Sequence, residues 1–322
     1  MLEIPFLLLL LFLYILAKSS TLVVENAAKL ARMLRIGQVG MGFLFIALAT
    51  SLPEAAISII SSTAKEGALA AGNVFGSNIA NILVILGMGA FLYGFPVSRK
   101  NLKEIALVLL LSTIITIYII FRSQVAGSTL GFFEGLLLLA VGGWYLLKSA
   151  NKDEMPAYES AKKLDVKNGA IYLVLFIISL VAVALSSMIV VASSLQLAEG
   201  LGLTESFMGA TIIAVGTSLP ELSIAIAAIR KKQYGLALGD AIGSCVANLT
   251  LVLGVAAVIS PISVQLKVFM AALLFSIVAN VVFLYIAAVK KKFEKTDGAI
   301  LLFLYAFYLF CIFFLQFSEA GF

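Results

Sequence analysis

Long uninterrupted apolar stretches are the feature of this sequence that most restricts its fold. They lie at residues 4–17, 105–121, 130–147, 170–185, 268–289 and 299–317. Several approach or reach the ~20 residues that a helix needs to cross a bilayer. Only 12% of the residues are charged, whereas roughly a quarter are charged in a soluble domain. Because the strands of a membrane barrel would alternate polar and apolar residues, the sequence predicts an all-α polytopic membrane protein.

The apolar stretches and the connections between them predict ten transmembrane helices. We expect these near residues 3–32, 36–63, 67–94, 102–121, 127–148, 168–198, 205–230, 234–259, 265–290 and 298–318. The long polar connection at residues 148–168 divides them into two groups of five and is interpreted as a cytoplasmic linker. The first apolar stretch follows no basic segment and precedes no small-residue cleavage site, so we expect a retained helix rather than a signal peptide.

The two halves of the chain share a sequence repeat with an offset of 167 residues. The run ATSLPE at residues 49–54 returns as GTSLPE at residues 216–221. The matched pairs are Gly42 and Gly209, Ala47 and Ala214, Thr50 and Thr217, Ser51 and Ser218, Pro53 and Pro220, Glu54 and Glu221, Gly72 and Gly239, Gly76 and Gly243, Ser77 and Ser244, Asn81 and Asn248, and Gly87 and Gly254. We therefore assign a first repeat to residues 1–147, with its motif at 42–88, and a second to residues 169–322, with its motif at 209–255.

The odd number of helices in each repeat determines their relative orientation. A second half that follows five spans enters the membrane from the opposite side, so the two five-helix repeats are predicted to be inverted. Many secondary transporters are built in this way, with a site near the midplane that opens alternately to each side. Of the Lys and Arg residues in connections, eighteen fall on one side and only Lys65, Arg122 and Lys267 on the other. This bias places both termini outside the cell and the protein in the cell membrane.

The glutamates of the repeated motif stand in apolar sequence without a basic partner. An ionised carboxylate at that depth costs a few kcal/mol or more, so Glu54 and Glu221 need a proton or a cation. Pro53 and Pro220 lack an amide hydrogen and are expected to release carbonyls near Ala49, Thr50, Gly216 and Thr217. The chain has no histidine. Two carboxylates with neutral oxygens form the ligand set of a hard cation, and calcium fits better than magnesium because its coordination geometry is flexible.

A site with two carboxylates is charge-balanced by one divalent or about two monovalent ions. Such a site can bind either the divalent ion or the monovalent ions, but hardly both at once. This competition is the physical basis of antiport. The paired motifs ATSLPE...GNVFGSNIANI and GTSLPE...GDAIGSCVANL resemble the two alpha repeats of the calcium/cation antiporter superfamily, and most of all its prokaryotic sodium/calcium exchanger branch. The resemblance implies a ten-helix fold in which helices 2, 3, 7 and 8 hold the ions while helices 1 and 6 slide across them.

The resemblance also implies roles for individual residues. Glu54 and Glu221 would be the calcium carboxylates, with the backbone carbonyls of Thr50 and Thr217 completing the shell. Asn81 and Asn248 would stand at the centre. Flanking monovalent sites would be formed by Ser51, Ser77, Ser218, Ser244, Ala47 and Ala214. Exchangers of this branch can carry an acid at the position of Asn248, so here the pocket is expected to hold two negative charges rather than three.

Asp240, which lies opposite Asn73 in the repeat, is a further possible site residue, although we interpret it first as an acid near a helix start.

Sodium is the expected counter-ion. Protons are the alternative, because burial favours the protonated form of a carboxyl group. A cation channel is less favoured, because it would require a symmetric oligomeric pore rather than a pseudo-symmetric site within one chain. An intramembrane enzyme lacks an accompanying nucleophile or metal-binding histidine, and the chain has no ATP-binding loop pattern.

The remaining features predict packing and orientation rather than chemistry. Cys245 and Cys311 lie in apolar helical sequence without a disulfide or CxxC pattern. Lys18 is expected either to extend toward the membrane interface or to pair with Glu25, and a role in transport is the less favoured possibility. The net charge of +5 resides in short loops, so the expected partners are calcium, sodium and the lipid bilayer, with no nucleic acid, obligate protein partner or cofactor.

Overall fold

The protein folds into a bundle of helices with two pairs of very short strands. The computed structural model describes residues 3–34, 38–63, 65, 67–124, 129–150, 169–200, 216, 218–263 and 267–319. The elements of the first half are α1 (Glu3–Met33), α2 (Gln38–Met41), η1 (Gly42–Ala47), α3 (Leu48–Thr50), α4 (Leu52–Thr63), α5 (Gly67–Ala80), η2 (Asn81–Leu86), α6 (Gly87–Tyr93), β1 (Phe95–Pro96), α7 (Arg99–Gln124), β2 (Thr129–Leu130) and α8 (Phe132–Ala150). Those of the second half are α9 (Gly169–Gly200), α12 (Leu219–Arg230), α13 (Tyr234–Ala247), η5 (Asn248–Val252), α14 (Leu253–Ile259), β3 (Ile262–Ser263), α15 (Lys267–Lys290), β4 (Lys292–Phe293) and α16 (Lys295–Glu319).

Seven helices of the described residues are long and apolar enough to cross a membrane. They cover Glu3–Met33, Ala70–Tyr93, Asn101–Phe121, Gly169–Ser194, Tyr234–Ile259, Met270–Lys290 and Lys295–Phe314, and a shorter apolar helix covers Phe132–Leu147. The expected helix at 36–63 is divided into short pieces, and of the expected helix at 205–230 the described part is mainly α12. The structure therefore confirms a polytopic helical membrane protein, while the count of ten spans stays a prediction.

Apolar side chains cover the outside of the bundle as well as forming its core, and buried polar side chains share the interior. Large apolar side chains cover the outside, as at Phe121, Phe303 and Phe310, which are all at least 65% exposed. Serine, threonine, asparagine and acidic side chains are instead found in the interior. This distribution is expected of helices that face hydrocarbon on the outside and must satisfy their polar groups within the protein.

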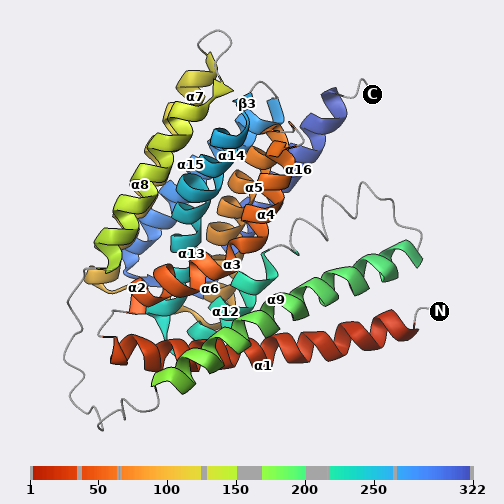
Figure 1. The fold of residues 1–322 in the computed structure, drawn as a ribbon, viewed down its shortest axis with the longest axis vertical. Coiled ribbons are helices and arrows are strands. Elements are labelled where there is room, and N and C mark those ends of the chain that lie inside the picture. Colours follow the sequence, from red (N-terminus) through yellow and green to blue (C-terminus); the bar gives the residue numbers. More distant parts are fainter. Residues whose placement is uncertain are drawn as a thin grey trace.

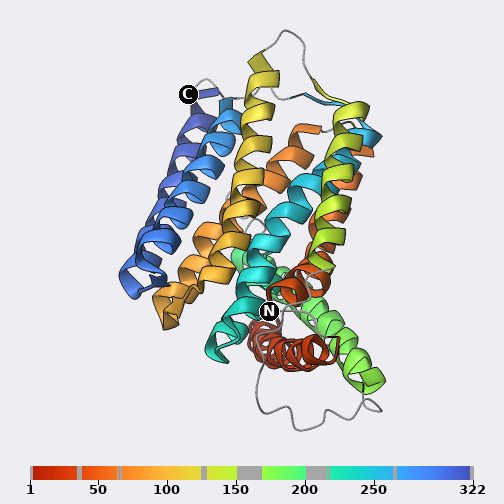
Figure 2. The ribbon, with the colours of Figure 1, turned by 90° about the vertical axis from the view of Figure 1, so that its left-hand side faces the viewer.

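Helix contacts in the first half recur with the two halves exchanged. The packing of α8 on α14 is matched by that of α16 on α6. Likewise the packing of α4 on η5 is matched by that of α12 on η2. Helices α1 and α9 lie side by side and cross the rest of the bundle steeply, with α12 packed against α1 (Figures 1 and 2). The short strands join the halves as well, since β1 pairs with β4 and β2 pairs with β3, both antiparallel.

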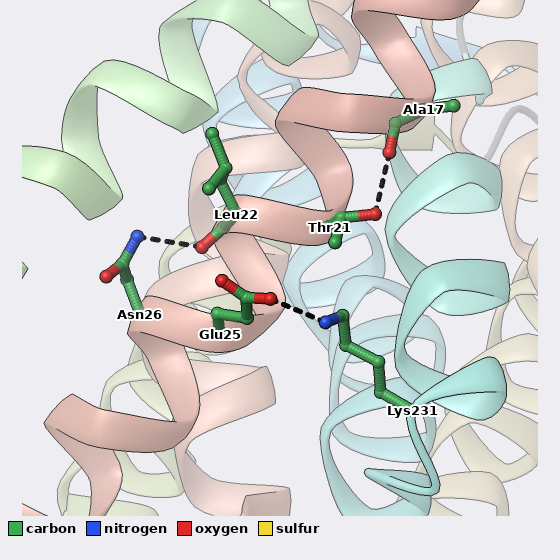
Figure 3. Close-up of polar contacts among 6 residues, drawn as sticks. All are labelled: Ala17, Thr21, Leu22, Glu25, Asn26 and Lys231. Carbon is green, nitrogen blue, oxygen red and sulfur yellow. Dashed lines mark hydrogen bonds and ion pairs between the residues drawn. The ribbon is translucent and has the colours of Figure 1, made fainter.

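Two polar contacts fasten α1 to α12. The Ser20 hydroxyl donates to Ser223 Oγ at 2.8 Å. Lys231, in the turn after α12, places its Nζ atom 2.6 Å from Glu25 Oε1 (Figure 3). The expectation that Lys18 could pair with Glu25 is therefore wrong. Lys18 is instead exposed on α1, with its ammonium 5.5 Å from the ring centre of Tyr14. The basic residue that reaches Glu25 comes from the loop after α12, a contact that the sequence of α1 alone could not reveal.

We expect the substitution Glu25→Gln to change stability only slightly. Both side chains of the Glu25–Lys231 pair are partly exposed, at 41% and 29%. Water screens such pairs, which typically contribute no more than about 1 kcal/mol. Thermal unfolding of purified protein in detergent should therefore shift by only a few degrees at most. A much larger shift would mean that this contact stabilises the position of α1 beyond its simple charge attraction.

Candidate functional site

The repeated proline motif interrupts a helix in each half. In the first half α3 ends at Thr50, and Ser51 has a ψ angle of 3°, outside the helical range. In the second half Ser218 has a ψ angle of 9° and precedes α12, which has Pro220 in its first turn. Proline provides no amide hydrogen to the carbonyl four residues earlier, so the helix opens at this point. The helix therefore opens next to each proline, while the release of individual carbonyls stays a prediction.

Two of the predicted site residues begin segments of π-helix. Asn81 is the first residue of η2, and Asn248 is the first residue of η5. A third π-helical segment, η1, ends at Ala47. Such segments are frequent at functional sites because the wider turn leaves backbone groups without their usual helical partner. No local sequence pattern predicted them, although the repeat had already placed both asparagines at equivalent positions.

The acidic side chains of the site are buried in the interior. Glu54 and Glu221 are each 1% exposed, and Asp240 is completely buried. Glu221 lies within electrostatic range of both Glu54 and Asp240. No ion pair joins any of the three to a lysine or arginine of the described chain. The expectation that the two repeats bring their glutamates close together is thus consistent with the structure.

Unsatisfied oxygen atoms concentrate at the predicted site. Among the described residues, nine buried side-chain oxygens have no hydrogen-bond partner. Seven of these atoms belong to residues singled out from the sequence: Ser51 Oγ, Glu54 Oε2, Asn81 Oδ1, Glu221 Oε2, Asp240 Oδ2, Ser244 Oγ and Asn248 Oδ1. Buried polar atoms without partners are rare and call for an explanation such as a bound ion. Oxygen acceptors gathered around carboxylates are a suitable environment for a hard cation such as calcium or sodium.

Asn78 fixes the orientation of the Asn248 side chain through a hydrogen bond. The Asn248 side-chain amide donates to Asn78 Oδ1 at 3.2 Å, which leaves Asn248 Oδ1 as an acceptor. Asn78 in turn donates to the carbonyl of Cys245 at 3.2 Å. Asn78 and Cys245 are 167 positions apart, the offset of the sequence repeat. No role for Asn78 was predicted, although its equivalence to Cys245 in the repeat could have drawn attention to it.

The structure places Asp240 in the interior of the bundle, beyond the first turn of α13. The first turn of α13 contains no acidic residue, and Asp240 lies further along this helix in the interior. Its Oδ1 atom lies 3.4 Å from the hydroxyl of Thr50, a residue of the first motif. Burial next to Thr50 supports the other possibility, that Asp240 belongs to the site.

The other predicted site residues differ in how the structure places them. Ser77 and Ser218 are buried, at 7% and 5% exposed. The carbonyl of Ala47 already accepts the amide of Ser51 at 3.0 Å. Thr217 and Ala214 lie outside the described residues. Cys245 and Cys311 are both free thiols within helices, as the sequence predicts.

Comparison with known proteins assigns the chain to a family. The family model of the sodium/calcium exchanger protein matches residues 4–149 and 171–314, which is most of the chain. The inner membrane protein YrbG of Escherichia coli is 34% identical over 76% of each chain. The sodium/calcium exchanger MaX1 of Methanosarcina acetivorans is 27% identical over 98% of this chain and its own full length.

A solved structure resembles the whole fold. The sodium-calcium exchanger NCX_Mj, soaked with sodium in the absence of calcium, superimposes with a TM-score of 0.80. The alignment covers 95% of this chain and 98% of the exchanger, with 26% sequence identity. The two alpha motifs, the buried carboxylates and these matches lead to the same conclusion. The chain belongs to the sodium/calcium exchanger protein family.

Proposed function

We propose that the protein is a secondary active antiporter that exchanges calcium for sodium across the cell membrane. The observation that supports this function most directly is the group of unpartnered buried oxygens around Glu54 and Glu221. A buried carboxylate without a basic neighbour requires a cation or a proton to offset its charge. Relatives described as exchangers and antiporters are consistent with a cation that leaves the site on each cycle.

The proposed calcium ion is held between the two halves of the molecule. Its ligands are the Glu54 and Glu221 carboxylates, together with the Thr50 and Thr217 backbone carbonyls. Asn81 and Asn248 lie at the centre. Monovalent ions occupy flanking positions formed by Ser51, Ser77, Ser218, Ser244, Ala47 and Ala214.

The proposed architecture comprises ten helices in two inverted repeats, residues 1–147 and 169–322, joined by a cytoplasmic linker at 148–168. Both termini face the outside. The exchange of helix contacts between the halves supports this arrangement, because an inverted duplication repeats each contact with its partners interchanged. Alternating access then consists of movement of one group of helices past the other around the ions. The long pair α1 and α9, which crosses the bundle, is the natural moving part (Figure 1).

The choice of counter-ion is tested with purified protein in liposomes. We expect uptake of radioactive calcium when an outward sodium gradient is imposed at constant pH on both sides of the membrane. An imposed pH gradient without sodium should give little uptake. Vesicles without protein control for leakage, and an ionophore that clamps the membrane potential separates coupling from voltage.

Exchange of calcium for protons is the second candidate. It is favoured by the absence of any ion pair between the three buried acids and a basic residue of the described chain, because a proton could neutralise each acid directly. Uptake that follows the pH gradient and is indifferent to sodium would establish this alternative. Calcium flux that runs down its own gradient without any coupled ion would instead indicate a channel.

A further inference from the structure

Asp240 differs from its counterpart in the first half because an ionised carboxylate can only accept hydrogen bonds, whereas an amide can also donate them. The counterpart, Asn73, donates its amide to the carbonyl of Glu54 and to Ser58 Oγ, both at 3.0 Å. An aspartate cannot donate in this way when it is ionised. The residue equivalent to Ser58 is Ala225, which offers no side-chain partner. The second half therefore replaces a hydrogen-bonded amide by a buried acceptor.

The single contact of Asp240 does not satisfy its charge. The Thr50 hydroxyl has one hydrogen and three acceptors in reach, namely the carbonyl of Ile46 at 3.2 Å, that of Ala47 at 3.3 Å and Asp240 Oδ1 at 3.4 Å. All three distances are long for a hydroxyl donor. Asp240 Oδ2 has no partner among the described residues, although the side chain is completely buried. Such a carboxylate needs a positive charge nearby.

Among the described residues, Asp240 does not form a single three-carboxylate metal site with the two glutamates. The described residues contain no group of three acidic, histidine or cysteine side chains close enough to share one metal ion. Asp240 nevertheless acts electrostatically on Glu221 and faces the hydroxyl of Thr50. It also lies closer than Asn248 to the start of α13, where Arg230, Lys231 and Lys232 indicate the cytoplasmic side. Thr50 thus lies between the two glutamates proposed to bind calcium and Asp240, which is the carboxylate nearer the cytoplasmic side.

We propose that Asp240 binds a sodium ion of its own, with the Thr50 hydroxyl as a neighbouring oxygen ligand. This inference rests on the proposed function and adds a third carboxylate to the two expected from the repeat. With this third carboxylate, bound cations have up to three buried negative charges to offset rather than two. Because the equivalent position on the outer side is the amide Asn73, the additional ion is bound only toward the cytoplasm.

The test is Asp240→Asn, which keeps the shape of the side chain and removes its charge. In liposomes the sodium concentration for half-maximal calcium exchange should rise by about tenfold or more, as expected for the loss of a charged ligand. In detergent, sodium should raise the unfolding temperature of this variant less than that of the wild type, while the effect of calcium is retained. Asp297→Asn is the matched control, because Asp297 is buried but already paired with Lys290 at 2.5 Å.

Other outcomes would overturn the inference. An unchanged sodium response in Asp240→Asn would show that the acid does not bind sodium, and a shift in pH dependence alone would assign a proton to it. If Asp240→Asn fails to fold, Glu54→Gln provides the second measurement: it should lose stabilisation by calcium and keep stabilisation by sodium, and loss of both would refute a separate sodium ion. Sodium-driven calcium uptake that survives Glu54→Gln would refute the proposed function itself, whatever Asp240→Asn does.

Discussion

Replacing Glu54 or Glu221 by glutamine is expected to reduce calcium transport by about 100-fold or more. The substitution retains the size of the side chain and removes one of the two charges that face a divalent ion in the membrane interior. Loss of one charged partner at a buried site costs about 3–5 kcal/mol, and each 1.4 kcal/mol corresponds to about tenfold in affinity. The measurement is initial calcium uptake into liposomes under a fixed sodium gradient, with calcium binding to the purified variants determined separately.

The matched control for the glutamates is Glu294→Gln. Glu294 is about half exposed, with its Oε1 atom 2.5 Å from Lys292 Nζ in the connection between α15 and α16. Its loss should leave uptake at the wild-type level, since water screens an exposed pair. If Glu54→Gln, Glu221→Gln and Glu294→Gln all reduced calcium uptake equally, the reduction would be explained by impaired folding. Normal uptake by Glu54→Gln would disprove that this carboxylate binds the transported ion.

Gly42→Ala should destabilise the fold substantially although it adds only one methyl group. A Cβ atom at Gly42 would lie 2.5 Å from the carbonyl oxygen of Leu236 and 2.8 Å from the amide nitrogen of Asp240. Both atoms belong to the backbone of α13, so no side chain can rotate out of the way. Overpacking typically costs about 1–3 kcal/mol, and each kcal/mol lowers the unfolding temperature by about 2–4 °C in a chain of this order of size.

Gly143→Ala is the control for this prediction. An added Cβ there meets no described atom within 4 Å, and alanine favours a helix more than glycine does. We therefore expect its unfolding temperature to stay level or rise slightly, as measured by thermal unfolding in the same detergent. Transport should fall in Gly42→Ala as well, because η1 sets the distance between the first motif and Asp240. Equal stability of the two variants would show that η1 and α13 can separate without cost.

The membrane class and the helix positions could be predicted because they depend on local composition. Apolar stretches such as 170–185 and 299–317 lie within α9 and α16, whose observed ends fall within a few residues of those expected. Candidate site residues could be proposed from the sequence because the same motif occurs twice. A single SLPE run is ambiguous, whereas two runs at a constant offset led to Glu54 and Glu221.

Features that depend on contact between distant segments could not be predicted. The π-helical turns that begin at Asn81 and Asn248 have no known local signature in these sequences. The partner of Glu25 comes from a loop 206 positions away, where sequence analysis considered only residues of the same helix. The burial of Asp240 against Thr50 could not be predicted for the same reason, because it follows from the close approach of α13 to the first motif.

The lengths of α1 and α9 link the protein to the thickness of its membrane. With 31 and 32 residues, each helix is about 46–48 Å long at a rise of about 1.5 Å per residue. The hydrocarbon core is only about 30 Å thick, so a helix of this length fits mainly by tilting. A bilayer of lipids with longer acyl chains should reduce this tilt and so change how both helices lie against the rest of the bundle. The host bilayer thereby acts on the same pair of helices that is proposed to move during exchange.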